Sequence, residues 1–196
     1  MSKVKVVLDA DVIIHFAKGG YLSVLPTILN EYDHIVLDIV YDELRGDVRT
    51  QLDNQMTFLK NIQLVSFEAT GEMMYEYFRL LENKGKGESA CLAYCRFTNN
   101  VIGSSNLKDT SDYCNKYGIV YLTTIDFLYY AVSRNLMNSD EAVGFIAEVR
   151  NKGSILPDVD FSTYQDILFI GKSIGTIVAA KIAHESQAKD RIRFIL

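Results

Sequence analysis

The N-terminal segment of the chain reads Val4-Lys5-Val6-Val7-Leu8-Asp9-Ala10-Asp11-Val12-Ile13-Ile14. Its first half is an apolar run of strand length, and Asp9 follows where that strand would end. An acid after a buried strand lies partly buried itself, and a buried carboxylate needs a partner. The segment therefore predicts a strand over residues 3–8 with a functional acid, Asp9, at its carboxyl end.

Three further acids occur far along the chain, at positions where a strand end or a helix start would deliver them to the same place. They are Glu43, Glu88 and Asp109. Carboxylates gathered at the carboxyl ends of parallel strands repel one another unless something positive lies between them. A hard divalent cation with oxygen ligands is the usual solution. The pattern therefore indicates a metal-dependent enzyme.

Acids at these positions also have a structural explanation. Asp and Glu are favoured near helix starts, both as caps and by the helix dipole, whatever the function. For Glu88 and Asp109 taken singly, capping is favoured over metal binding. Asp11 is either a second metal ligand or the cap of the first helix, with the cap favoured, and Asp42 is expected to face solvent. Asp9 is the acid that capping explains least well.

Strand-like and helix-like segments alternate along the chain, which favours an α/β fold with a largely parallel sheet. Strands are expected over residues 3–8, 34–38, 62–67, 101–103 and 119–122. Helices are expected over residues 11–18, 21–30, 47–60, 70–83, 88–98, 107–117, 124–136 and 139–151, with one more carrying Glu43.

Length and composition narrow the class of protein. The 196 residues, 48% of them hydrophobic, fit one domain with an appendage or one large domain. No targeting or membrane segment is expected. Cys91, Cys95 and Cys114 lack the paired spacing of a zinc site or a disulfide framework, which favours a cytoplasmic protein. The formal net charge of −5 argues against strong nonspecific nucleic-acid binding, although metal ligands would supply part of that charge.

The order and spacing of these motifs resemble the PIN domain, the nuclease fold of many bacterial toxin–antitoxin toxins and RNA-processing enzymes. The resemblance covers about residues 3–155. It is carried by the strand ending in Asp9, the apolar helix Val12–Ala17 before Lys18-Gly19-Gly20, the Val-x-x-Glu-Leu motif at Val40–Leu44, the helix start Gly87–Cys91 and the helix stop Lys116–Ile119. The family commonly has an Asp after the fourth strand, where this chain has Asn106. Some members carry the acid one helical turn later, here Asp109 or Asp112.

The resemblance implies a three-layer PIN-like sandwich with a mostly parallel central sheet, and hydrolysis of RNA phosphodiester bonds. It implies Mg²⁺ or Mn²⁺ bound by catalytic carboxylates, namely Asp9, Glu43, Glu88 and Asp109. Candidate contacts to water or phosphate are Ser104, Ser105, Asn106 and Lys86. A toxin of this kind would have an antitoxin protein as its partner. The sequence leaves open the RNA target and whether the chain forms a homodimer.

The C-terminal residues 156–196 show a different pattern. Asp166–Ala180 reads as an apolar strand, a Gly-x-Ser-x-Gly turn and a small-residue helix, which resembles the nucleophile elbow of α/β-hydrolases. Ser173 would be its vestigial nucleophile, because His184 is the only histidine after it and lies in the same predicted helix, so no triad can be assembled. We therefore divide the chain into a PIN-like domain, residues 1–155, and an appended βα segment, residues 156–196. A fused hydrolase fragment is favoured slightly over a βα unit that packs on the first domain.

Three classes of function follow from these patterns. A metal-dependent ribonuclease is favoured, and the toxin of a toxin–antitoxin pair would be one such enzyme. A serine-hydrolase remnant without a complete triad is the second class, and a noncatalytic PIN-like module that binds RNA or protein is the third. Chelator-sensitive RNA cleavage would select the first class, and labelling of Ser173 by a fluorophosphonate would select the second. Binding without either activity would select the third.

Overall fold

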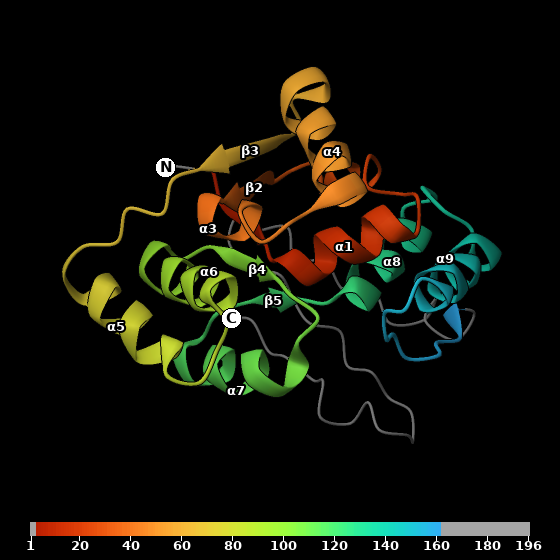
Figure 1. Cartoon of the computed structure of the whole chain (residues 1–196). Coiled ribbons are helices and arrows are strands. Elements are labelled where there is room, and N and C mark those ends of the chain that lie inside the picture. Colours follow the sequence, from red (N-terminus) through yellow and green to blue (C-terminus); the bar gives the residue numbers. More distant parts are fainter. Residues whose placement is uncertain (1–2, 162–196) are drawn as a thin grey trace.

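The structure, a computed structural model, describes residues 3–161, apart from the side chains of residues 107–109. Its centre is a five-stranded sheet with the order β3-β2-β1-β4-β5 (Figure 1). The strands are β1 (Lys5–Leu8), β2 (Asp33–Leu37), β3 (Ile62–Val65), β4 (Val101–Gly103) and β5 (Tyr121–Leu122). All neighbouring strands are parallel. The prediction of an α/β fold with a mostly parallel sheet is confirmed.

The first strand lies at the middle of the sheet, because its apolar run can be covered on both faces. Val6, Val7 and Leu8 are fully buried, as expected for a central strand of a parallel sheet. The chain builds outward from β1 through β2 to β3, and then returns to place β4 on the other side of β1. The strand order therefore reverses between β1 and β4, and in open parallel sheets ligands bind at the carboxyl ends of the strands at such a point.

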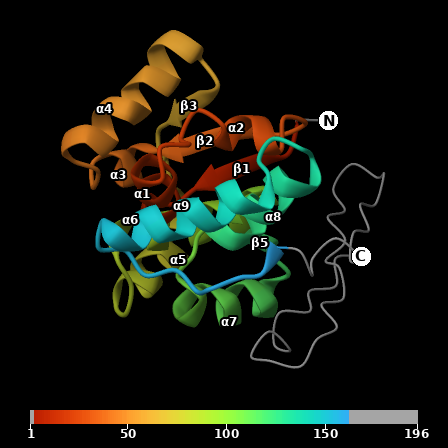
Figure 2. The ribbon, with the colours of Figure 1, turned by 90° about the vertical axis from the view of Figure 1, so that its right-hand side faces the viewer.

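Two groups of helices cover the sheet, one on each side (Figures 1 and 2). On one side α1 packs against α4, α8 and α9, and α2 packs against α8. On the other side α6 packs on β1, β2 and β4 and against α3, α5 and α7. The first group comprises α1 (Ala10–Lys18), α2 (Leu25–Ile28), α4 (Gly46–Asn54) with its π-helical continuation η1 (Gln55–Leu59), α8 (Thr124–Ser133) and α9 (Ser139–Asn151). The second comprises α3 (Asp38–Tyr41), α5 (Gly71–Leu81), α6 (Lys86–Thr98) and α7 (Leu107–Tyr117).

An aromatic cluster joins the helices of the first group. The ring of Phe16 in α1 lies 6.1 Å from that of Phe127 in α8 and 5.0 Å from that of Phe145 in α9, between ring centroids. Gly19 makes room for this packing, since a Cβ at that position would lie 2.3 Å from the Phe145 ring. The glycine after α1 therefore allows α9 to join the same hydrophobic core.

Two predicted helices are shorter than expected. The helix predicted over residues 21–30 is confined to α2, which ends at Ile28 because its C-cap, Leu29, has a non-helical backbone with φ −124° and ψ 59°. The helix predicted to carry Glu43 ends at Tyr41, so Glu43 lies in the turn that follows α3. Backbone bonds from Glu43 to Val40 and from Leu44 to Tyr41 form that turn. Gly46 then has a positive φ of 55°, and the chain enters the next helix, α4, at this residue.

The described chain stays packed on the core beyond the last helix. Leu156 and Phe161 are buried, and the Arg150 guanidinium donates to the Leu156 carbonyl at 2.7 Å. The division into residues 1–155 and 156–196 remains a prediction, and Ser173 with its Gly-x-Ser-x-Gly turn lies outside the described residues. Within residues 3–161, no helix has the length and apolar character needed to cross a membrane.

Candidate functional site

The strand-order reversal places two segments side by side, the end of β1 and the end of β4. The Asp9 N–H donates to the Gly103 carbonyl at 2.8 Å, which continues the pairing of β1 with β4 by one residue. Asp9 is then the N-cap of α1, and its carboxylate accepts from the Ala10 N–H at 2.8 Å. Ser104 directly follows β4 and is fully buried. The sheet thus brings Asp9 and Ser104 together from positions 95 residues apart.

The Ser104 hydroxyl joins two carboxylates. It donates to Asp9 Oδ2 at 3.1 Å and lies 3.5 Å from Asp11 Oδ2. Asp11 also accepts from two backbone N–H groups, that of Val12 at 2.6 Å and that of Ser105 at 2.7 Å. The cap of α1 is therefore Asp9, so the prediction that Asp11 caps this helix is wrong. Asp11 reaches instead to the segment after β4, and its carboxylate lies beside that of Asp9.

The surroundings of this pair disfavour its negative charge. Burial, and next the charge of Asp11, raises the pKa of Asp9 to about 7. Burial also raises the pKa of Asp11 to about 6, against the lowering effect of its backbone donors, and the charge of Glu88 adds to the rise. Two poorly hydrated carboxylates that must share a site favour protonation or a bound cation. Perturbed acids of this kind are concentrated at functional sites.

Glu88 lies near the pair, in the first turn of α6. One of its oxygens is 3.2 Å from Lys84 Nζ, and the two side chains are only 11% and 12% exposed respectively. The Thr110 hydroxyl donates to the same oxygen, Oε1, at 3.4 Å, and the other oxygen, Oε2, accepts from the Asn106 amide at 3.3 Å. Glu88 contributes to the raised pKa of both Asp9 and Asp11. It therefore connects α6 to the segment after β4 and adds a third negative charge close to the pair.

Glu43 approaches the same end of α6 from the turn after α3. Its carboxylate accepts from the Gly87 N–H at 2.8 Å, while the residue stays largely exposed. A Cβ at Gly87 would lie 2.8 Å from the Glu43 carboxylate, so this approach needs a glycine. Burial raises the pKa of the Cys91 thiol, one turn further along α6, and the charges of Asp9, Asp11 and Glu43 contribute to the rise. The carboxylates therefore gather around the N-terminal half of α6, with Glu43 committed to a helix-capping bond.

The Asp9–Asp11 pair fits a hard divalent cation by its chemistry. Carboxylate oxygens are the ligands that Mg²⁺ prefers, and Mg²⁺ is usually bound by one or two carboxylates together with waters and substrate phosphates. Within the described residues, no group of three or more His, Cys, Asp or Glu side chains is arranged to hold a metal ion. The pair thus matches an open site completed by water and substrate rather than a closed protein cage.

Other predicted residues lie around this site in different settings. Ser104 and Ser105 contact the carboxylate pair, whereas Asn106 and Lys86 are exposed and Asn106 contacts Glu88. The side chain of Asp109 lies outside the described residues. The prediction that Asp42 faces solvent is confirmed, since its side chain is 75% exposed.

A hydrogen-bond network that the sequence did not predict links Asp11 to His15. Asp11 accepts from Ser105, whose hydroxyl lies 2.7 Å from the Thr124 hydroxyl. The Thr124 hydroxyl lies 2.9 Å from Nδ1 of His15, a buried residue of α1. Burial lowers the pKa of His15 to about 4, so the ring is neutral at physiological pH. This network connects the segment after β4 to α1 and α8. The adjacent serines at the end of β4 were its only signal in the sequence.

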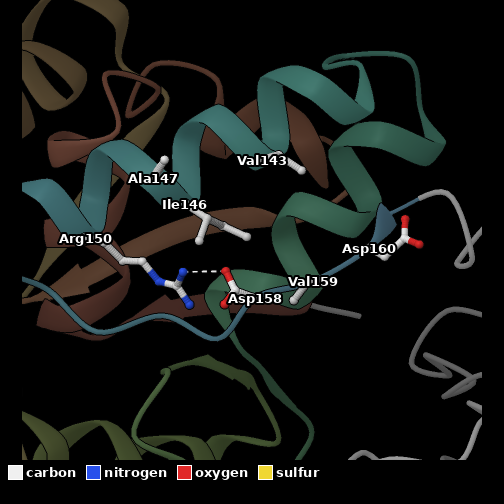
Figure 3. A pocket seen from close by; sticks show the side chains of 7 residues that line it. All are labelled: Val143, Ile146, Ala147, Arg150, Asp158, Val159 and Asp160. Atoms are coloured by element: carbon white, nitrogen blue, oxygen red, sulfur yellow. Dashed lines mark hydrogen bonds and ion pairs between the residues drawn. The ribbon is translucent and has the colours of Figure 1, made fainter.

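A separate cavity of about 350 Å³ lies beside α9 (Figure 3). Its lining residues are Val143, Ile146, Ala147, Arg150, Asp158, Val159 and Asp160. Arg150 and Asp158 form an ion pair across it (Figure 3). It shares no residue with the acidic site.

Comparisons with known proteins find similarity in structure but not in sequence. No protein-family model matches the sequence, and no curated protein sequence matches it significantly. Among solved structures, the chain is similar to one in the crystal structure of VapBC2 from Rickettsia felis bound to a DNA fragment from their promoter. The identity is 10% and the TM-score is 0.44, over 61% of this chain and 98% of that chain.

Proposed function

We propose that this chain is a divalent-metal-dependent nuclease that hydrolyses RNA. The observation that carries the proposal is the pair formed by the buried Asp9 and the partly buried Asp11, joined by Ser104 where the order of the parallel strands reverses. A site for hydrolysing phosphodiesters needs oxygen ligands that favour a divalent cation beside an open position for the substrate. RNA as the substrate is supported by the sequence resemblance to PIN domains.

The roles of the residues follow from their positions. Mg²⁺ or Mn²⁺, when bound, would activate a water and offset the charge that develops on the phosphate oxygens. Asp9 would be the central ligand and Asp11 its partner, with Ser104 fixing the orientation of both carboxylates. Glu88 and Glu43 would act through bound water, because each already accepts hydrogen bonds from the protein. Asp109 remains our predicted fourth ligand.

Contacts to the substrate are proposed for the exposed polar groups nearby. Lys86 begins α6 and is exposed, so it can reach a phosphate oxygen. Asn106 is also exposed, its amide donates to Glu88, and it can contact the same substrate. The formal net charge of −5 implies that binding depends on these local contacts rather than on a general attraction.

The proposal is tested with purified full-length protein and single-stranded or structured RNA. Cleavage should require Mg²⁺ or Mn²⁺ and stop with a chelator. Asp9→Asn and Asp11→Asn should each abolish it, whereas the matched control Asp42→Asn, which changes an exposed acid, should cleave like the wild type. Cleavage that survives in the chelator or in Asp9→Asn would overturn the proposal. Asp109→Asn, assayed in parallel, decides whether that residue is the fourth ligand.

The finer proposal is that the chain is the toxin of a toxin–antitoxin pair. It rests on the same sequence resemblance to PIN domains. Expression should then arrest growth, and coexpression with a small protein encoded by an adjacent gene should relieve the arrest. Growth arrest that persists in Asp9→Asn would show that the toxicity does not come from the proposed site.

A further inference from the structure

Lys84 lies in the turn that joins α5 to α6 (Figure 1). Its N–H donates to the Leu80 carbonyl at 3.1 Å, and its side chain is only 12% exposed. Lysine is among the residues that are least often buried, because its ammonium loses hydration in the protein interior. Lys86, two residues further along the chain, is exposed. The fold therefore withdraws Lys84 from solvent, although it leaves Lys86 accessible.

The partner of Lys84 is Glu88. The Lys84 Nζ lies 3.2 Å from Glu88 Oε1, and the Glu88 side chain is only 11% exposed. Thr110 donates to the same oxygen, and the Asn106 amide donates to Oε2. A charge pair that is shielded from water is stronger than an exposed pair, and breaking it leaves a buried charge without compensation. Glu88 therefore has an ammonium of its own, which a divalent ion at Glu88 would have to displace.

The Asp9–Asp11 pair has neutral donors instead. Both acids accept from backbone N–H groups, and the Ser104 hydroxyl donates to Asp9. Burial is the main cause that raises the pKa of Asp9 to about 7 and that of Asp11 to about 6. Two carboxylates held by neutral donors favour a cation between them, whereas Glu88 already has one. The pair is therefore the position that the site offers to a divalent ion.

We propose that Lys84 is the second cation of the acidic site, which takes a single divalent ion at Asp9 and Asp11. The inference rests on the proposed nuclease function and deepens it. Nucleases that use two metal ions hold them about 3.5–4 Å apart, so that both the attacking and the leaving oxygen are stabilised. In this chain the Lys84 ammonium contacts Glu88, the acid whose charge acts on both Asp9 and Asp11. Lys84 then supplies the second positive charge to the phosphate.

The first test counts the Mn²⁺ ions that metal-free full-length protein binds, from the electron paramagnetic resonance signal of the free ion. The wild type should bind one ion per chain. Lys84→Met keeps an unbranched side chain and removes its charge, so Glu88 is freed and a second ion should bind. Lys84→Met/Glu88→Gln should bind one ion again. The matched control Lys152→Met breaks an exposed pair with Glu148 that has the same spacing of four residues, and it should bind one ion.

The possible counts separate this inference from the proposed function. A second ion in the wild type, or a single ion in Lys84→Met, would overturn the role of Lys84 and leave the nuclease proposal standing. A wild type that binds no Mn²⁺ would refute the nuclease proposal, and this inference with it. The wild-type count needs no variant, and thermal unfolding verifies that each variant is folded.

The second test is the Mn²⁺ dependence of RNA cleavage. Cleavage by the wild type should saturate as one ion binds, and Lys84→Arg, which keeps the charge, should retain this dependence. Lys84→Met should lose about 100-fold in kcat at Mn²⁺ concentrations that fill only the first position, the usual effect of removing one group that stabilises developing charge. Its activity should recover in part, with a sigmoidal dependence, when the second ion binds. Wild-type kcat in Lys84→Met at low Mn²⁺ would overturn the proposal. Low activity at every Mn²⁺ concentration would do so too, because it would show a merely structural role.

Discussion

Replacing Asp9 by Asn should stabilise the metal-free protein at mildly alkaline pH, although Asp9 is the proposed central ligand. Asn is as good an N-cap as Asp, so the bond from the Ala10 N–H can be kept. The amide can also donate to the neighbouring Asp11 carboxylate. The substitution therefore removes a buried negative charge without leaving the start of α1 uncapped.

The magnitude follows from the pKa of Asp9, which burial and Asp11 raise from 3.8 to about 7. At about 1.4 kcal/mol per unit, the ionised carboxylate destabilises the fold by up to about 4 kcal/mol above pH 7. Because the folded state binds the proton more tightly than the unfolded state, stability falls as pH rises through the interval between these two values. Below that interval the carboxyl is protonated in both states and the penalty disappears. We expect a measured gain of about 1–4 kcal/mol, since Asp11 shares the effect.

The assay is urea unfolding of the wild type, Asp9→Asn and the exposed control Asp42→Asn, with a chelator, at about pH 5 and about pH 8. Asp9→Asn should gain stability over the wild type mainly at the higher pH, and Asp42→Asn should behave as the wild type at both. Millimolar Mg²⁺ or Mn²⁺ should then stabilise the wild type more than Asp9→Asn, because a ligand that binds the folded state shifts unfolding. A loss of stability in Asp9→Asn at about pH 8 would refute the electrostatic reasoning.

Three further predictions test the fold. Glu76, whose pKa is lowered to about 2 mainly by the hydrogen bond from an arginine in the same helix, should stabilise the fold above pH 4.5 and lose that effect as pH falls toward 2. Glu76→Gln should therefore cost up to about 3 kcal/mol in urea unfolding at neutral pH, and an unchanged midpoint would contradict this. Gly19→Ala should lower the free energy of unfolding by about 1–3 kcal/mol, because the added methyl group displaces the Phe145 ring. Gly144→Ala, on α9 where a Cβ meets open space, should raise it by up to about 1 kcal/mol. Equal effects of the two substitutions would contradict the predicted clash. In the native protein three buried free thiols, with reactivity suppressed by burial, should resist alkylation until urea exposes them, and rapid native labelling would show that the core opens. They are Cys91, Cys95 and Cys114.

Much of the local structure could be predicted from the pattern of neighbouring residues. The strand at β1, the helix α7 and the helix α9 agree closely with the predicted residues 3–8, 107–117 and 139–151. Each has a clear apolar period or a clear end signal, such as Gly118 after α7. The helix predicted to carry Glu43 was too long, because the chain leaves α3 after Tyr41 through a turn for which the neighbouring residues give no clear stop signal.

The site was predictable in part. Asp9 was correctly expected to be a partly buried acid at a strand end, because burial of that strand follows from its own residues. The position of Asp11 could not be predicted from the sequence, since its main partners are the serines after β4. Likewise, Glu43 has no local signal for its bond to the Gly87 N–H, because the two are 44 residues apart.

The sequence by itself determined which segments form strands and helices and which acid ends the central strand, because these properties depend on residues close in the chain. Only the tertiary structure decided that β4 lies beside β1, and with it that Ser104 joins Asp9 to Asp11. Strand order depends on how the apolar faces of all the helices and strands are buried together, so it cannot be predicted from any single segment. The same holds for the raised pKa of Asp9, which arises from burial and from a neighbouring charge that only packing brings close.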